Sequence, residues 1–91
     1  DPSVLTAGVT ADNPTVSSGD IYPVARAVVN YGEEQQPVTL NYRFYWYDAK
    51  GLDIFPHEPP RTIKLNPGQE VRLESTSANT RAKQVRLSLY L

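Results

Sequence analysis

The stretch Val38-Thr39-Leu40-Asn41-Tyr42-Arg43-Phe44-Tyr45-Trp46-Tyr47 decides the fold of this chain. One face of it carries only apolar or aromatic side chains, at spacing two: Val38, Leu40, Tyr42, Phe44 and Trp46. Such a period indicates a β-strand with one face on a core, because successive strand side chains point to opposite sides. A helix would turn Tyr42 and Trp46 away from Leu40 and Phe44. The β-branched and aromatic content also favours a strand.

The rest of the chain is divided into short segments by eight Pro and five Gly. Because no segment of about a dozen residues keeps a 3.6-residue apolar period with caps, we expect no helix. The further predicted strands are Val4–Thr10, Tyr22–Tyr31, Leu52–Phe55, Arg61–Leu65, Glu70–Ser75 and Lys83–Leu91, with Leu52–Phe55 as a short edge strand. Their predicted inward side chains are Ala25, Ala27, Val29, Ile63, Leu65, Val71, Leu73, Val85, Leu87, Leu89 and Leu91.

Residues that favour turns separate these strands. Turns are predicted at 12–14, 17–20 and 48–51, and a type II turn at Asn66-Pro67-Gly68. About seven short strands with turns between them are typical of an immunoglobulin-like antiparallel β-sandwich. We therefore predict an all-β chain with residues 1–91 as a single domain, and a small barrel is the alternative.

The charged and reactive residues exclude several functions. Nine Lys and Arg against ten Asp and Glu leave a net charge of −1, so nucleic acid is not expected as a partner. The absence of cysteine excludes disulfides, thiolate metal sites and cysteine nucleophiles. His57, the one histidine, is interpreted as a solvated loop residue, and Asp48 as a turn aspartate. We expect no enzyme, no cofactor and no metal site, although Asp48, Asp53 and Glu58 lie near one hairpin.

The other face of the decisive strand holds the candidate site. If the last strand pairs with Val38–Tyr47, the outward side chains there are Arg43, Tyr45, Tyr47, Arg86 and Tyr90. Tyr and Arg are enriched at binding hot spots, which favours an interaction face. Cross-strand Tyr and Arg pairs also stabilise sheets by themselves, so a purely structural role is the alternative.

Three stretches carry a resemblance to a known family. They are Pro37–Leu52 with Pro56 and Glu58, then Pro60–Ile63, and Lys83–Leu91. They resemble the YcfL-like family of small periplasmic lipoproteins of Gram-negative bacteria, whose function is not established. The resemblance implies a periplasmic location, with a signal peptide and a lipidated cysteine upstream of Asp1 as the only membrane attachment. The chain lacks Met, so it is expected to be a processed or trimmed form.

These observations lead to two hypotheses about function. The first is a non-enzymatic protein–protein interaction module of the cell envelope, which docks another envelope protein. The alternative is a module that binds glycans or peptidoglycan fragments in a concave aromatic groove. The last strand is expected at a sheet edge, where two copies of the chain would pair as a homodimer.

Overall fold

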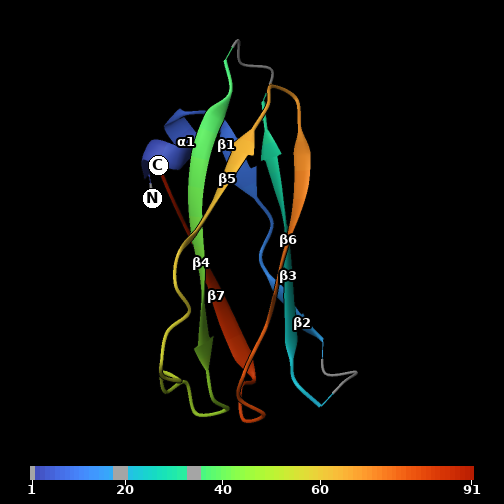
Figure 1. Ribbon diagram of the computed structural model, residues 1–91, viewed down its shortest axis with the longest axis vertical. Helices are drawn as coiled ribbons and strands as arrows, with labels where there is room; N and C mark the ends of the chain where they lie inside the picture. The colour runs from blue at the N-terminus through green and yellow to red at the C-terminus, as the bar shows by residue number, and fades with distance from the viewer. Residues whose placement is uncertain (1, 18–20, 33–35) are drawn as a thin grey trace.

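The computed structural model describes residues 2–17, 21–32 and 36–91. The chain folds into two antiparallel sheets that pack face to face (Figure 1). In one sheet, β3 pairs with β6 on one side and with both β1 and β2 on the other; the second sheet has the order β5-β4-β7. The elements are α1 (Pro2–Thr6), β1 (Val9–Ala11), β2 (Thr15–Ser17), β3 (Val24–Tyr31), β4 (Val38–Tyr47), β5 (Arg61–Leu65), β6 (Glu70–Thr76) and β7 (Gln84–Tyr90). The predicted sandwich is confirmed, with seven strands in the described ranges.

Strand β4 is the middle strand of its sheet and has the predicted bounds. Its even face lies on the core, with Leu40, Phe44 and Trp46 buried to 5% exposure or less. Val38 and Tyr42 are half-buried and pack against that core. The decisive stretch therefore forms the strand that its alternation predicts.

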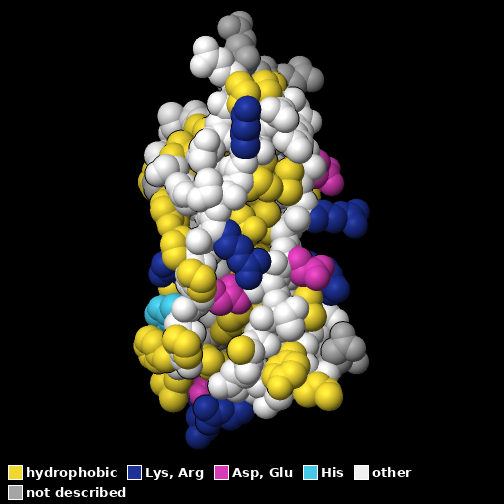
Figure 2. Space-filling model, viewed as in Figure 1, with side chains coloured by type: hydrophobic (Ala, Val, Ile, Leu, Met, Phe, Trp, Pro, Cys, Tyr) yellow, Lys and Arg dark blue, Asp and Glu magenta, His cyan; other side chains and the backbone are white. Residues whose placement is uncertain are grey.

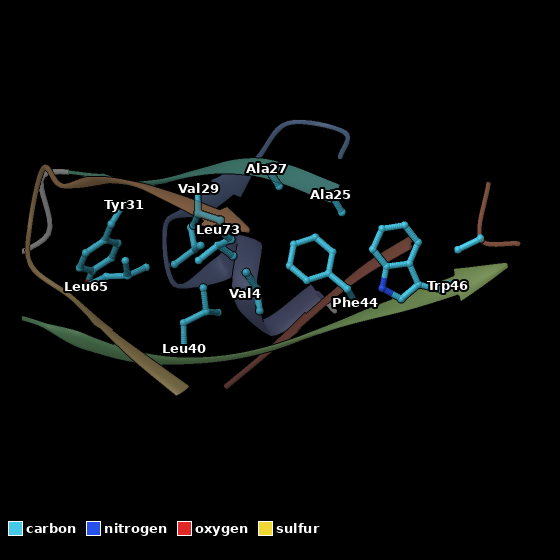
Figure 3. Close-up of a cluster of buried hydrophobic side chains, with 12 residues drawn as sticks. Val4, Ala25, Ala27, Val29, Tyr31, Leu40, Phe44, Trp46, Leu65 and Leu73 are labelled. Atoms are coloured by element: carbon cyan, nitrogen blue, oxygen red, sulfur yellow. The ribbon is translucent and has the colours of Figure 1, made fainter. Parts of the chain in front are cut away.

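The core lies between β3 and β4 and joins bulky side chains to small ones (Figure 3). Phe44 and Trp46 extend from β4 toward β3, where Ala25 and Ala27 leave room for their rings. At the other end, Leu40 of β4 lies among aliphatic side chains of the opposite sheet. A fully buried side chain of this kind stabilises the fold by about 1.5–3 kcal/mol, so this layer is the main source of stability.

The N-terminal strand prediction, Val4–Thr10, is wrong up to Gly8, and its last two residues belong to β1 (Val9–Ala11). Pro2 begins α1, where its missing N–H costs no hydrogen bond. Gly8, at φ 93°, ends the helical turn by donating its N–H to the Leu5 carbonyl at 3.0 Å. Val4 is buried at 3% exposure, so α1 adds to the core beside β1 and β7.

The second strand also begins later than predicted, at Val24 instead of Tyr22. Pro23 has no N–H to donate, and Tyr22 is 46% exposed. The short β2 falls partly in a stretch predicted as turns, because its three residues are all exposed and give no alternating pattern. Residues 18–20 of that predicted turn lie outside the described residues.

The predicted edge strand Leu52–Phe55 is reduced to a single bridge between Tyr47 and Asp53. Leu52 and Phe55 are 62% and 69% exposed, and of the four residues Ile54 alone packs against the core. Arg61–Leu65 has the predicted bounds, and the turn at 66–69 closes with the Gln69 N–H on the Asn66 carbonyl at 3.0 Å.

The last strand, β7, lies at an edge of its sheet, as predicted. Val85, Leu87 and Leu89 pack against the core, but Leu91 lies beyond the strand end and is 47% exposed. The inward placement predicted for Leu91 is therefore wrong. No helix in the described ranges has the length and apolar character that a membrane crossing requires.

Candidate functional site

The pairing of β4 with β7 places the predicted interaction residues on one outer face. Tyr45 lies opposite Arg86, and Arg43 lies opposite Ser88. Tyr47, two residues along β4, points to the same side. The condition on which the prediction depended, pairing of the last strand with Val38–Tyr47, is met.

Tyr45 is the centre of this face and contacts two guanidinium groups. The Cζ atom of Arg86 lies 4.7 Å from the centroid of the Tyr45 ring, and that of Arg43 lies 5.6 Å from it. Both distances are in the range of cation–π attraction. Hydrogen bonds fix the two arginines: Arg43 Nη1 donates to the Tyr45 hydroxyl and Arg86 Nε to the Tyr47 hydroxyl, each at 3.2 Å.

The segment after β4 adds two further rings to this face. His57 meets Tyr45 edge to face at 5.0 Å between ring centroids, and Phe55 stacks on His57 at 4.6 Å. The His57 side chain is 30% exposed and lies 3.7 Å from the Asp53 carboxylate. His57 lies in a loop, as predicted, but its interpretation as a solvated residue is wrong, because its ring packs against two aromatic rings. We call the following residues the aromatic–arginine cluster: Arg43, Tyr45, Tyr47, Phe55, His57 and Arg86.

Phe55, a member of the aromatic–arginine cluster, and Leu52, three residues before it, form an exposed apolar rim. Phe55 and Leu52 both project from the segment that follows β4, and more than half of each is exposed. In Figure 2 the single histidine lies directly above a group of hydrophobic side chains at the lower left of the molecule. Apolar side chains next to Tyr and Arg are the composition expected of a protein contact.

Tyr90 is the predicted site residue that lies apart from the cluster. It pairs with Asn41, four residues along β7 from Arg86. Tyr90 lies diagonally beside Arg43, but it is not part of the ring and guanidinium contacts that join the other members. Four of the five predicted side chains thus form one contact network.

Glu58, which the sequence placed among three carboxylates near one hairpin, has contacts that the sequence did not predict. Its Oε1 atom accepts a hydrogen bond from Trp46 Nε1 at 3.1 Å and another from the Ser75 hydroxyl. Its Oε2 atom lies 4.0 Å from Arg61 Nη2, and the side chain is only 19% exposed. A buried indole N–H normally needs an acceptor, so the inward position predicted for Trp46 was the one available signal of this bond.

The other carboxylates near this hairpin have simpler roles. Asp48 Oδ1 accepts the backbone N–H groups of Lys50 and Leu52 at 2.9 and 3.0 Å, which confirms Asp48 as a turn aspartate. Across residues 2–17, 21–32 and 36–91, no three histidine or carboxylate side chains are grouped to hold a metal ion.

Comparison with known proteins identifies relatives over the whole chain. The model of a family described as "Protein of unknown function (DUF1425)" matches residues 1–91. The uncharacterized protein YcfL of Escherichia coli (strain K12) is 45% identical over 89 residues, which span 98% of this chain and 70% of that protein.

Two crystal structures share the fold. A DUF1425 family member from Shewanella sp. pv-4 has a TM-score of 0.83 over 91% of this chain and 77% of its own length. Campylobacter jejuni Cj0090 has a TM-score of 0.67 over 91% of this chain and 84% of its own length. Each is 21% identical to this chain, so the likeness establishes the sandwich and nothing about activity.

Proposed function

This chain belongs to the DUF1425 family of proteins of unknown function, and we propose that it is a non-enzymatic interaction module that docks a protein of the bacterial cell envelope. The docking surface is the aromatic–arginine cluster with its Leu52 and Phe55 rim. Membership confirms the predicted resemblance to the YcfL-like proteins. The lipid anchor and the periplasmic location stay predictions that rest on that resemblance.

The observation that carries this proposal is the preorganised Tyr45 centre beside exposed apolar side chains. Hydrogen bonds and ring contacts already hold Arg43 and Arg86 against Tyr45, so binding would immobilise few additional rotamers. Hot spots combine buried Tyr or Arg anchors with a surround that excludes water. Phe55 is 69% exposed, so a partner that packs on it would remove a large apolar surface from water.

The same geometry favours a protein over a glycan as the ligand. A sugar ring stacks on an open aromatic face, but Arg86 lies over the Tyr45 ring and His57 meets it edge to face. A glycan stacked on Tyr45 would have to displace these contacts. A protein side chain could instead pack on the Phe55 ring and hydrogen-bond to the outer N–H groups of the arginines.

Quantitative pull-down from envelope extract tests the docking surface. The wild-type domain is compared with the double variant Tyr45→Ala/Phe55→Ala and with Tyr22→Ala. Tyr22 is a matched control because it is an exposed tyrosine ahead of β3, in the other sheet. We expect recovery of a specific partner to fall about tenfold or more with the double variant, since a hot spot contributes about 2 kcal/mol, and to stay unchanged with Tyr22→Ala. Equal recovery by all three forms would exclude this surface.

Pairing between two copies of the chain is tested in a separate experiment. The edge position of β7 supports the proposal that two copies pair through it. Sedimentation velocity over a wide range of concentrations should then show a dimer. A monomer mass at every concentration would exclude pairing through β7 and leave the docking proposal intact.

A further inference from the structure

A hollow of about 360 Å³ opens beside the aromatic–arginine cluster, between the segment at 54–61 and the end of β6. Phe44, Trp46 and Ile54 contribute apolar walls, and Glu58 contributes a carboxylate. Its volume is at the small end of the range for ligand pockets, which is about 300–1,000 Å³. The hollow therefore suits a single side chain or another ligand of that size.

The two oxygens of the Glu58 carboxylate have different partners: Oε1 accepts hydrogen bonds, and Oε2 faces a guanidinium at longer range. Oε1 accepts from Trp46 and Ser75, which fixes the plane of the group. Oε2 forms a long ion pair with Arg61, whose Nη2 atom lies 4.0 Å away, beyond hydrogen-bond distance. Arg61 uses its Nη1 atom on the Glu74 carbonyl at 3.1 Å. A carboxylate oxygen whose paired cation lies beyond hydrogen-bond distance can still accept a hydrogen bond from a second cation that enters the hollow.

We propose that this hollow receives the cationic side chain, Lys or Arg, of the protein that docks on the aromatic–arginine cluster. The aliphatic stem would lie against Phe44 and Trp46, and the charged head would donate to Glu58 Oε2. Rings around a cation add cation–π attraction, whereas an anionic side chain would face the Glu58 charge. Arg61 leaves the hollow close to neutral, so the contact is weak by itself and contributes within a larger interface.

The position of the hollow ties this inference to the proposed function, on which it rests. Phe55 and His57 line the hollow and also belong to the aromatic–arginine cluster. A partner seated on the Phe55 ring can therefore extend one long side chain over the rim to Glu58. The docking surface and the hollow form one continuous contact area.

Trp46 provides a direct readout because it is the only tryptophan in the chain. Its indole N–H gives one resonance, and that N–H is bonded to Glu58. The probe is Nα-acetyl-lysine-N-methylamide, a lysine with both ends blocked as in a protein chain. Its neutral match is Nα-acetyl-norleucine-N-methylamide, which has the same stem without the amino group. We expect a saturable shift of the indole resonance with the lysine probe and affinity about tenfold weaker with the norleucine probe.

Two variants with opposite expected effects separate binding from damage to the fold. Glu58→Gln keeps an acceptor for Trp46 and Ser75 but removes the charge, and should weaken the lysine probe about tenfold. Arg61→Leu removes the competing cation and should tighten binding about threefold. Glu70→Gln, an exposed carboxylate on β6, is the matched control and should leave affinity unchanged.

The outcomes are distinct. Equal affinity for the lysine and norleucine probes, or no saturable shift with either, would overturn the proposal. Tighter binding of free butane-1,4-diamine than of the blocked lysine would assign the hollow to a small amine and likewise overturn it. The titration needs only the domain and the probe, so the proposal about the hollow can fail while the pull-down still supports the docking surface. The pull-down variants leave Glu58 in place, so the docking surface can likewise fail while the titration succeeds.

Discussion

The guanidinium carbon of Arg86 lies 4.7 Å from the centroid of the Tyr45 ring, and the two residues face each other across β4 and β7. Such cross-strand pairs contribute to sheet stability whether or not a partner binds. Stability and binding must therefore be measured separately for this face.

A double-mutant cycle of Tyr45→Ala and Arg86→Ala measures the intrinsic pair energy. We expect a coupling of about 0.5–1 kcal/mol in urea unfolding, because exposed cation–π pairs have that size. The control cycle pairs Tyr45→Ala with Lys64→Ala, at the far end of the same face, and should be additive. A coupling above about 2 kcal/mol would show that the pair is chiefly structural, which would weaken its assignment to docking.

The two phenylalanines of the chain give a matched pair for stability. Phe44 is 1% exposed, so Phe44→Ala should cost about 3–5 kcal/mol through lost burial and the cavity left behind. Phe55 is 69% exposed, and Phe55→Ala should change stability by about 0.5 kcal/mol or less. Chemical unfolding measures both, with Phe44→Leu as a milder variant if Phe44→Ala does not fold. A large cost for Phe55→Ala would show that the rim supports the fold and is not reserved for a partner.

The strands with a one-sided apolar face were those that the sequence predicted well. Val38–Tyr47 and Arg61–Leu65 have their predicted bounds, and Glu70–Thr76 ends one residue later than predicted. A strand whose side chains are all exposed, such as Thr15–Ser17, has no alternation to detect. The short α1 has fewer residues than a helical period needs to be recognised, so its single buried residue, Val4, looked like a strand residue.

The candidate site was predicted in part for a similar reason. Outward positions on β4 and β7 follow from spacing alone, so Arg43, Tyr45 and Arg86 could be placed together before the structure was known. Residues 54–58 lie against β4 through tertiary contacts: His57 contacts Tyr45, and Glu58 bonds to Trp46. Sequence periodicity carries no information about contacts of this kind.

Two glycines should respond differently to the same substitution. Gly68 has φ 75° in the turn before β6, where a side chain is strained, so Gly68→Ala should cost about 1–2 kcal/mol. Gly32 does not have a positive φ, and a Cβ there would meet the Gly8 carbonyl oxygen at an ordinary contact distance of 3.6 Å. Gly32→Ala should be neutral or stabilise the fold by about 0.4–1 kcal/mol through the unfolded chain. Thermal unfolding compares the two, and a destabilised Gly32→Ala would contradict this account.

Ser75 tests how strongly Glu58 is held. Its hydroxyl donates to the Glu58 carboxylate and the residue is 3% exposed, so Ser75→Ala leaves Oε1 with Trp46 as its remaining donor. We expect a loss of about 1.5–3 kcal/mol in urea unfolding, the size of a hydrogen bond to a charged group.

The control for Ser75→Ala is Ser88→Ala, on the outer face of β7 opposite Arg43, with an expected change of about 0.5 kcal/mol or less. Combining Ser75→Ala with Glu58→Gln should cost less than the sum of the two single changes, because each removes the same charged bond. Strict additivity would mean that the hydroxyl stabilises the fold through packing alone. In that case Trp46 would hold Glu58 in the wild type and in Ser75→Ala alike, and the indole resonance should be the same in both forms.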